Sequence, residues 1–422
     1  MRYLLHVLVI VNLLYSHQSR AEEVLTIGVA GTNGVAREMV YFLAEAFEQK
    51  TPNVKIRFIV REGESYKSDL QSMIEKDDGY DVVFWMAGER FNQYIRLDLV
   101  TPITDIWQSH QLSDNFSNNL NNAITLNKQI YAIPFSRYQW GMLYNKRLFD
   151  RLSLSPPNNW QQFIDVLGVL KSENIIPIYV GSKYNWEISA WFEFLNLRLN
   201  GYDFHQSFIK GESPVDSPQI RLVFKYWQAL IESGYFAVQK ESNLREGLPY
   251  LYREHGGLML AGSYFTAFVQ PKKLNDMGFF SFPQIDPQIE NVEIAPVDIV
   301  FIAERAKNKV LAKKFLVFLS SKYAQEKFNR GSHFLPANKL SEIPENEIFQ
   351  SVQNSLNNVN QQTLFFDREA EDTFAQQNMD IWRDYIDSPT IDAANVDKAI
   401  KSMEEARLNL LSRSCVGDCN ID

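Results

Sequence analysis

The stretch 129–149, QIYAIPFSRYQWGMLYNKRLF, changes character in its middle, and this change constrains the fold more than any other feature of the sequence. Residues 129–135 have the pattern of a strand that closes at Pro134, which lacks a backbone N–H and favours extended geometry in the residue before it. An aromatic and charged interval, 136–140, then leads into a second apolar run at 142–144. We therefore expect the chain to leave one packed body and enter another here.

Predicted strands and helices alternate along the chain up to about residue 303, and only helices follow. Near the N-terminus, apolar runs typical of buried strands are separated by segments whose apolar residues fall on one helical face. This β-α-β-α-β order predicts a parallel sheet, which binds ligands at the carboxyl ends of its strands. The expected strands are 24–30, 54–60 and 80–85, and their carboxyl ends lie at residues 31–34, 61–64 and 85–89.

The glycines around the first of these ends do not form a dinucleotide-binding motif. Gly28, Gly31 and Gly34 have the spacing G-x-x-G-x-x-G, whereas the motif requires G-x-G-x-x-G. The second strand also ends in Arg61. A strand-to-helix turn that needs small residues explains the glycines better, and we expect no cofactor.

Residues 1–21 have the organisation of a secretory signal peptide. Arg2 precedes the apolar run 3–14, and small residues precede position 22, so we expect cleavage after Ala21 and a periplasmic location. The apolar run is shorter than the roughly 20 residues that a membrane-spanning helix needs. We therefore interpret the segment as a leader and not as an anchor.

The two cysteines of the chain, Cys415 and Cys419, lie near its C-terminus. Neither is close to the expected cleavage point, where a lipid would be attached, so we expect a soluble exported protein. In an oxidising compartment the pair is placed to close a small loop as a disulfide, and two free thiols in a polar tail are the alternative. Two ligands are too few for a metal site, and we expect no metal.

Length and charge narrow the class of protein further. Without residues 1–21 the chain is still long for a single core, which predicts two domains or lobes. Cleavage changes the net charge from −9 to −11, because Arg2 and Arg20 are lost and no acidic residue is. This balance argues against a nucleic-acid partner, since contacts with phosphate are made mainly by basic residues.

Several short segments form an ordered set that covers nearly the whole chain after residue 21. They are YDVVFW at 80–85, IYAIP at 130–134 with LYNKRLF at 143–149, the segment 157–163 with its Trp160, NGYDF at 200–204, GGLMLAGSY at 256–264, and the helix 312–319 with FLPA at 334–337. In this order they resemble family 1 extracellular solute-binding proteins, the maltose-binding-protein-like receptors of ABC importers. Each segment alone is a weak signal, and the ordered set is specific.

The resemblance implies an α/β protein with the two-lobe periplasmic-binding-protein fold (type II, maltose-binding-protein-like) and a ligand cleft between the lobes. The implied lobes are residues 22–134 plus 299–334 and residues 135–298 plus 335–422. The chain would cross between them near 134–137, 296–299 and 333–337. The pairing of these pieces into lobes comes from the resemblance and not from the periodicity of the sequence.

The resemblance also implies a function without catalysis. A monomeric receptor would bind a small carbohydrate, close over it, and deliver it to a membrane permease and its ATPase. Two departures leave the identity of the ligand open: residues 295–300 lack the glycine-rich loop of many members, and Tyr264 stands where tryptophan is common.

Aromatic side chains are the first candidates for such a site, because a sugar presents flat apolar faces. Tyr264 follows the turn Gly262-Ser263, which brings backbone close to a ligand, and Trp186 begins a helix after a loop. Trp85 ends a strand of the first lobe, where packing is an equally good explanation. Of Tyr138 and Trp140, we expect one to face the cleft and the other the core.

Polar candidates at strand ends and crossings are Asn33, Glu64, Arg137 and Asp298. They would orient the hydroxyl groups that rim a sugar. Arg137 has a second interpretation, since its guanidinium could bind the carboxylate of an acidic sugar in a bidentate fork. An ion pair that spans the crossing is the structural alternative.

The sequence gives little support for a catalytic function. Its histidines have no metal-binding spacing, and H-E-x-x-H and G-x-S-x-G are both missing. An exported glycan-active enzyme would use two carboxylates, of which Glu64 and Asp298 are the first pair to test. A periplasmic sensor that docks on a membrane receptor kinase is the other alternative.

Overall fold

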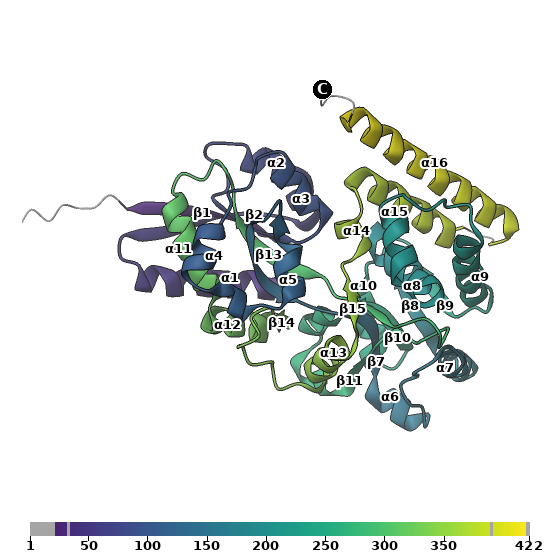
Figure 1. Ribbon diagram of the computed structural model, residues 1–422. Coiled ribbons are helices and arrows are strands. Elements are labelled where there is room, and N and C mark those ends of the chain that lie inside the picture. Colours follow the sequence, from purple (N-terminus) through teal and green to yellow (C-terminus); the bar gives the residue numbers. More distant parts are fainter. Residues whose placement is uncertain (1–21, 32–33, 389–390, 419–422) are drawn as a thin grey trace, which may run out of the picture.

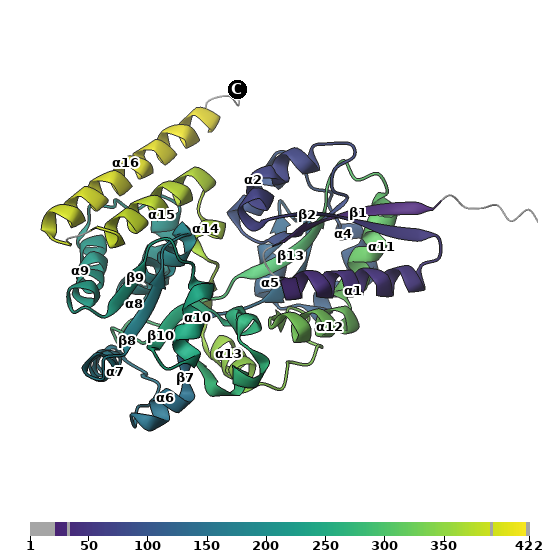
Figure 2. The same cartoon turned by 180° about the vertical axis from the view of Figure 1, so that it is seen from behind.

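The computed structural model describes residues 22–31, 34–388 and 391–418 of the chain, and it consists of two α/β lobes. Figures 1 and 2 show the lobes side by side, each with its own sheet and its own covering helices. Strands from distant parts of the sequence share one sheet: β13 and β14 lie in the sheet of β1, β2, β3 and β6, whereas β7 to β11 form the other sheet. Each lobe is therefore assembled from separate pieces of the chain. None of the helices in the described ranges is long and apolar enough to cross a membrane.

The first lobe is built on a six-stranded sheet in which the order of strands is β14-β6-β13-β3-β1-β2. Strand β1 runs parallel to both β2 and β3, as the β-α-β-α-β pattern predicts. Strand β13 returns from much later in the chain and lies antiparallel between β3 and β6. The strands are β1 (Glu23–Ala30), β2 (Val54–Arg61), β3 (Val82–Met86), β6 (Ala132–Arg137), β13 (Val297–Ile302) and β14 (Leu335–Pro336).

Helices pack apolar faces against this sheet. In α1 the buried residues Val40, Leu43 and Phe47 recur at intervals of three and four, the spacing of one helical face. The other helical segments of the first lobe are α2 (Gly63–Ile74), α3 (Glu89–Arg96), α4 (Thr104–Ser109), η1 (Leu112–Asn115), α5 (Asn118–Ala123), α11 (Lys309–Ser320) and α12 (Lys322–Ser332), with α1 itself at Gly34–Lys50 and a small hairpin of β4 (Thr125–Leu126) and β5 (Gln129–Ile130).

The second lobe is built on a five-stranded sheet with the order β11-β7-β10-β8-β9. Strands β8, β9 and β10 are parallel, whereas β7 is antiparallel to its neighbours β10 and β11. The strands are β7 (Trp140–Asn145), β8 (Ile176–Gly181), β9 (Phe236–Gln239), β10 (Gly256–Gly262) and β11 (Met277–Phe280), and a separate pair is formed by β12 (Val292–Ile294) and β15 (Gln361–Thr363).

The long helix α8 (Asn185–Ile209) is the centre of the second lobe. Its residues 187–198 are all buried, so it is enclosed by sheet and helices, and it is kinked at Gly201, where φ is 79°. The other helical segments of this lobe are α6 (Lys146–Arg151), α7 (Trp160–Ser172), α9 (Pro218–Glu232), α10 (Leu244–Tyr252), η2 (Ser263–Phe268), η3 (Pro271–Asp276), α13 (Glu347–Asn358), α14 (Phe366–Glu369), α15 (Asp372–Ile386) and α16 (Ala393–Asp418).

The first crossing between the lobes lies later in the chain than the sequence suggests. Pro134 does not close its strand, because β6 continues through it to Arg137 and β7 begins at Trp140. The register of β6 against β13 shifts between Asp298 and Ile299, next to the position that pairs with Pro134. Proline is tolerated at such an irregularity, where no ladder hydrogen bond is lost. The crossing therefore consists of residues 138–139.

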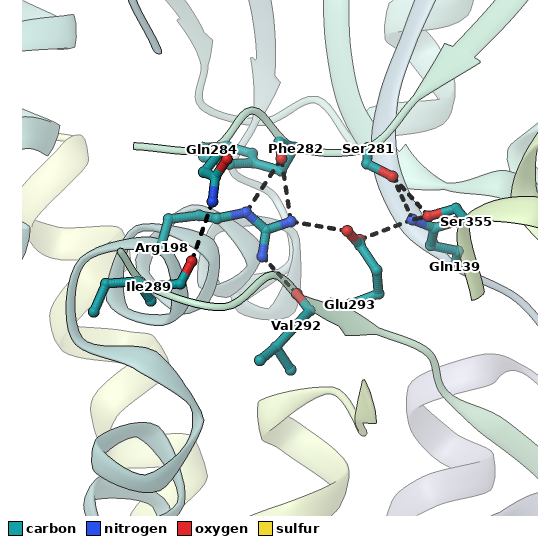
Figure 3. A network of polar contacts seen from close by, with 9 residues as sticks. All are labelled: Gln139, Arg198, Ser281, Phe282, Gln284, Ile289, Val292, Glu293 and Ser355. Atoms are coloured by element: carbon teal, nitrogen blue, oxygen red, sulfur yellow. Dashed lines mark hydrogen bonds and ion pairs between the residues drawn. The ribbon is translucent and has the colours of Figure 1, made fainter. Parts of the chain in front are cut away.

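A buried polar network fixes this crossing to the second lobe (Figure 3). Gln139 Nε2 lies within hydrogen-bond distance of three oxygens, Glu293 Oε2 at 2.8 Å and the hydroxyls of Ser281 at 3.0 Å and Ser355 at 2.9 Å, and its two N–H groups are shared among them. The other oxygen of Glu293 accepts from Arg198 Nη2 at 2.9 Å, and both ionised side chains are almost wholly buried. Since Glu293 lies in β12, just before the second crossing, one network holds both crossings to the same lobe.

Candidate ligand-binding cleft

A cavity of about 660 Å³ lies between the lobes, within the range of sites that hold small molecules. The first lobe contributes the ends of β1 and β3 and the start of α2, and the second lobe contributes the starts of α8 and α10. The cavity is also lined by the crossing segments and by residues 365–368. The carboxyl ends of the β1 and β3 strands are thus part of its wall, as expected for a sheet of this type.

Stacked aromatic rings form much of the wall on the side of the crossings. The rings of Tyr264 and Phe334 are nearly parallel, with centroids 5.3 Å apart, and Tyr138 meets Tyr264 edge-on at 4.8 Å. Trp140 stacks on Phe365 at 4.5 Å. All five side chains line the cavity, so apolar ring faces and edges are presented to any ligand.

A second aromatic pair lies where α8 begins. The rings of Tyr184 and Trp186 are nearly parallel at 6.3 Å, and Trp186 meets Trp140 edge-on at 6.0 Å. Tyr184 is 36% exposed, which places this pair toward solvent. On the opposite lobe Trp85 packs against Tyr66, and its indole N–H finds no hydrogen-bond partner in the described part of the chain.

A charged cluster lies beside the aromatic rings. Arg368 donates from Nη1 to Asp298 Oδ1 at 2.8 Å and from Nη2 to the Tyr138 hydroxyl at 2.7 Å. Burial raises the pKa of Tyr138 well above its usual value, so this phenol remains protonated. Burial works against the charge on Arg368, but Tyr138, Asp298 and Asp367 outweigh it and raise the pKa of the guanidinium.

A second cluster joins the two lobes. Lys67 of α2 lies 3.3 Å from Glu64 of the same helix and 3.7 Å from Asp367 of α14. The side chain of Glu64 is 60% exposed, whereas that of Asp367 is 7% exposed. Lys67 and Arg368, two of the four basic residues of the described chain that line the cavity, therefore have carboxylate partners within its wall; the other two are Arg37 and Arg245.

Glu187 is the most deeply buried carboxyl group in this wall, with 2% of the residue exposed. It lies in the first turn of α8, and its Oε1 accepts a 2.9 Å hydrogen bond from the backbone N–H of Leu244 at the start of α10. Burial raises the pKa of Glu187 to about 8. The side chain is thus mostly uncharged at neutral pH.

The structure brings most of the predicted site residues together. Those that line the cavity are Glu64, Trp85, Tyr138, Trp140, Trp186, Tyr264 and Asp298. Asn33 and Cys419 lie outside the described residues, and Cys415 falls within α16.

Three predicted residues, Arg137, Gly262 and Ser263, are not part of the cavity lining. Arg137 donates to Gln353 Oε1 at 2.6 Å on α13 and to the Pro336 carbonyl at 3.4 Å, so its guanidinium is used to connect β6 with the third crossing. Among the described residues it has no ion-pair partner, so the alternative of an ion pair across the crossing is replaced by these two hydrogen bonds.

The Gly262-Ser263 turn supports the aromatic wall from behind. A Cβ atom at Gly262 would meet the ring of Tyr264 at 2.5 Å and that of Tyr138 at 3.1 Å, so glycine is required for these two rings to pack. The backbone N–H of Ser263 donates to the carbonyl of Gln139 at 2.8 Å, which ties the turn to the first crossing.

Tyr138 and Trp140 both line the cavity, and Trp140, which is 1% exposed, also packs within the core. The residue between them, Gln139, points the other way into the buried network (Figure 3). In extended backbone, residues two apart lie on the same face. Gln139 therefore lies on the face opposite to these two rings.

Sequence reasoning missed the segment 365–368 and Glu187. Phe365, Asp367 and Arg368 line the cavity, but they belong to a region for which the sequence predicts only helices. Two phenylalanines followed by alternating charges are the feature of the sequence that marks this segment. Glu187 is hidden by its place next to Trp186, at the start of a helix whose residues 187–198 are all buried. Across the described ranges, no group of three or more His, Cys, Asp or Glu side chains is arranged to hold a metal ion.

Comparison with known proteins agrees with this architecture. An uncharacterised ABC-transporter extracellular-binding protein of Pyrococcus horikoshii is 26% identical over 73% of this chain and 70% of its own length. The solute receptor AcbH, described as having an exclusive preference for β-D-galactopyranose, superposes with a TM-score of 0.85 and 23% identity over 92% of this chain and all of its own.

A chitin oligosaccharide binding protein also superposes, with a TM-score of 0.80 and 20% identity, over 91% of this chain and 99% of its own. At these identities the two superpositions show a shared fold. The family model described as bacterial extracellular solute-binding protein matches residues 33–326, well over half of the chain. The chain therefore belongs to the bacterial extracellular solute-binding proteins.

Proposed function

We propose that this protein is the receptor of an ABC importer, and that it binds a neutral carbohydrate in the cleft between its lobes and delivers it to a membrane permease. The observation that carries the proposal is the composition of the cavity wall. Aromatic rings from both lobes and from the crossings suit the apolar faces of a sugar, and carboxylates beside them suit its hydroxyl groups.

The pairing of Lys67 and Arg368 with carboxylates favours a neutral ligand over an acidic one. Of the other two basic residues that line the cavity in the described chain, Arg37 donates to the Gly31 carbonyl and Arg245 lies over the ring of Phe268. Arg368 is bound to Asp298, and Lys67 lies against Glu64 and Asp367. Arg137, the residue that suggested a uronate, is turned toward α13. An acidic sugar would have to compete with existing carboxylates for these cations, whereas neutral hydroxyl groups can share them.

The proposed function is binding and release without covalent chemistry. Ligand would stabilise a closed arrangement, because only that arrangement lets residues of both lobes contact it at once. Names of similar proteins support the carbohydrate class: one is a maltotriose-binding protein of Pyrococcus abyssi, 24% identical over 66% of this chain and 58% of its own length.

Export is part of the same proposal. Residues 1–21 would direct the chain out of the cytoplasm and be removed after Ala21, leaving a monomeric receptor in the periplasm. Mass spectrometry of the protein recovered from the periplasmic fraction of an expressing cell would give the new N-terminus.

A thermal-shift screen tests the ligand class. The chain from residue 22 onward is melted with neutral mono- and oligosaccharides, uronates, polyols and amino acids, because a ligand that binds the native state raises the melting temperature by mass action. At least one neutral carbohydrate is expected to raise it. A rise with only uronates, only amino acids or none of the panel would overturn the proposal, and cleavage of a glycosidic bond in the same mixtures would replace it with an enzymatic function.

A further inference from the structure

Glu187 carries a polar atom for which the folded chain provides no partner. Its Oε1 accepts from the backbone N–H of Leu244, but its Oε2 is buried without a hydrogen-bond partner among the described residues. The residue belongs to the lining of the cavity, next to Trp186. A buried polar group is normally paired, so an unpaired one in a cavity wall points to a group supplied from outside.

A second carboxyl group on the same helix provides a comparison. Glu193 is also buried, one of its oxygens accepts a 3.0 Å hydrogen bond from the Phe366 N–H, and its other oxygen has no partner in the described chain. It does not line the cavity. Both carboxyl groups are thus buried with one oxygen held by a backbone N–H, and only that of Glu187 lines the cavity.

We propose that Glu187 is a specificity-determining residue of the cleft, and that its Oε2 donates a hydrogen bond to an acceptor oxygen of a neutral carbohydrate. This inference rests on the proposed function. It assigns to one side chain the recognition of an acceptor oxygen of the ligand.

The donor role follows from the way the carboxyl group is held. Oε1 already accepts a hydrogen bond from the Leu244 N–H. In the neutral acid Oε1 is therefore the carbonyl oxygen, and Oε2 carries the proton. An O–H group at that position has no acceptor among the described residues and requires one from the ligand. A ligand carboxylate would also accept from it, so this hydrogen bond selects for an acceptor oxygen, and the preference for a neutral ligand rests on the pairing of Lys67 and Arg368 with carboxylates.

Charged and titratable groups of several neighbouring elements act on Glu187. Burial is the largest effect and raises the pKa of Glu187 to about 8. Glu246 of α10 also raises this pKa, whereas the N–H groups of Leu244 and Tyr184 and the charge of Lys183 lower it. Tyr179 of β8 and Tyr264 of η2 also lie within electrostatic reach. Arg245 of α10 lines the same cavity, with its guanidinium over the ring of Phe268. Above pH 8 Glu187 loses the proton that it donates.

The experiment is a calorimetric titration of a neutral carbohydrate that binds the wild-type protein, repeated at pH 6.5 and pH 9.5. Glu187→Gln keeps an acceptor for Leu244 and places an N–H donor where Oε2 lies, and this donor does not titrate. Glu187→Met has a similar length and no donor. Glu193→Gln is the matched control, since it makes the same change on the same helix away from the cavity. Thermal unfolding of each variant at both pH values reports folding separately.

The expected Kd of the wild-type protein and of Glu193→Gln rises roughly tenfold from pH 6.5 to pH 9.5, the effect of losing one neutral hydrogen bond. Glu187→Gln is expected to bind at pH 6.5 nearly as well as wild type and to keep its Kd at pH 9.5, and Glu187→Met to bind roughly tenfold more weakly at pH 6.5.

A wild-type Kd that does not change with pH, a Glu187→Gln variant that loses affinity as wild type does, or a Glu187→Met variant with wild-type affinity would overturn the role of Glu187. Each of these results would leave the carbohydrate receptor function in place. If no neutral carbohydrate binds the wild-type protein at pH 6.5, the proposed function fails first, and the role of Glu187 fails with it.

Discussion

Arg368 donates a 2.7 Å hydrogen bond from Nη2 to the hydroxyl of Tyr138, and so joins two segments that lie 230 positions apart in the chain. Tyr138 belongs to the first crossing between the lobes, and Arg368 to the short helix α14 that follows the third. The same guanidinium holds Asp298, the second residue of β13. One side chain of the second lobe therefore connects the first and second crossings at the edge of the cleft.

Arg368→Lys is expected to weaken both folding and ligand binding. A lysine keeps the charge but has no planar fork, so it cannot serve Asp298 and Tyr138 together. Loss of one charged hydrogen bond in this partly buried position costs about 1–3 kcal/mol of unfolding free energy. Urea denaturation and calorimetric titration measure the two effects. Arg305→Lys, which changes an exposed pair with Asp77, is the control, and equal stability of the two variants would contradict the role of Arg368.

Glu293→Gln is expected to destabilise the protein strongly, because it leaves the buried guanidinium of Arg198 without a counter-charge. Removing one partner of a buried ion pair typically costs about 3–5 kcal/mol. The double variant Arg198→Met/Glu293→Met removes both charges and is expected to lose less than the single variant. Urea denaturation of both proteins tests this, and a double variant less stable than Glu293→Gln would show that the charges are not coupled as described.

Arg137→Gln is expected to lower the stability of the protein and to leave its affinity for a carbohydrate unchanged. The substitution removes the hydrogen bonds to Gln353 and Pro336, so a loss of about 1.5–3 kcal/mol in unfolding free energy is expected. The Kd for a neutral carbohydrate is expected to stay unchanged, because Arg137 does not line the cavity. Loss of affinity without loss of stability would return Arg137 to the ligand site.

The free energy of unfolding is expected to depend on pH because His205 is buried. Burial lowers its pKa to about 3 in the folded protein, whereas an unfolded histidine titrates near about 6.5. Between these values the unfolded state binds the proton and the folded state does not, so this residue reduces stability as pH falls from about 6.5 toward 3. Denaturation of wild type and His205→Gln at pH 7 and pH 4 checks the sign. The variant should lose less stability on acidification, and an equal loss would contradict the assignment.

The alternation of strands and helices in the first lobe and the presence of a crossing near residue 137 could both be predicted from the sequence. They depend on local patterns: the apolar runs of β1, β2 and β3, and the aromatic interval before Met142. The end of β6 could not be placed, because Pro134 lies next to a shift of register against β13, and that shift depends on a strand more than 160 positions away.

The aromatic residues of the cleft were easier to predict than its charged residues. Trp85, Trp186 and Tyr264 stand at strand or helix ends, where a local pattern marks them. Arg137 and Arg368 each follow a phenylalanine by two positions, and neither sequence context shows which groups the guanidinium meets in space. Their partners, Asp298 and Gln353, come from distant segments, so no local pattern could have told the ligand site from the structural contact.

The most direct test of the account is the affinity of one neutral carbohydrate, identified in the thermal-shift screen, measured by calorimetric titration of wild type, Trp186→Ala and Tyr323→Ala. Trp186 lines the cavity, whereas Tyr323 is an exposed aromatic residue on α12 outside it. We expect Trp186→Ala to bind at least roughly fivefold more weakly, from the loss of about 1 kcal/mol or more of ring contact, and Tyr323→Ala to bind as wild type does. Equal affinity of all three proteins for that carbohydrate would contradict a binding site between the lobes.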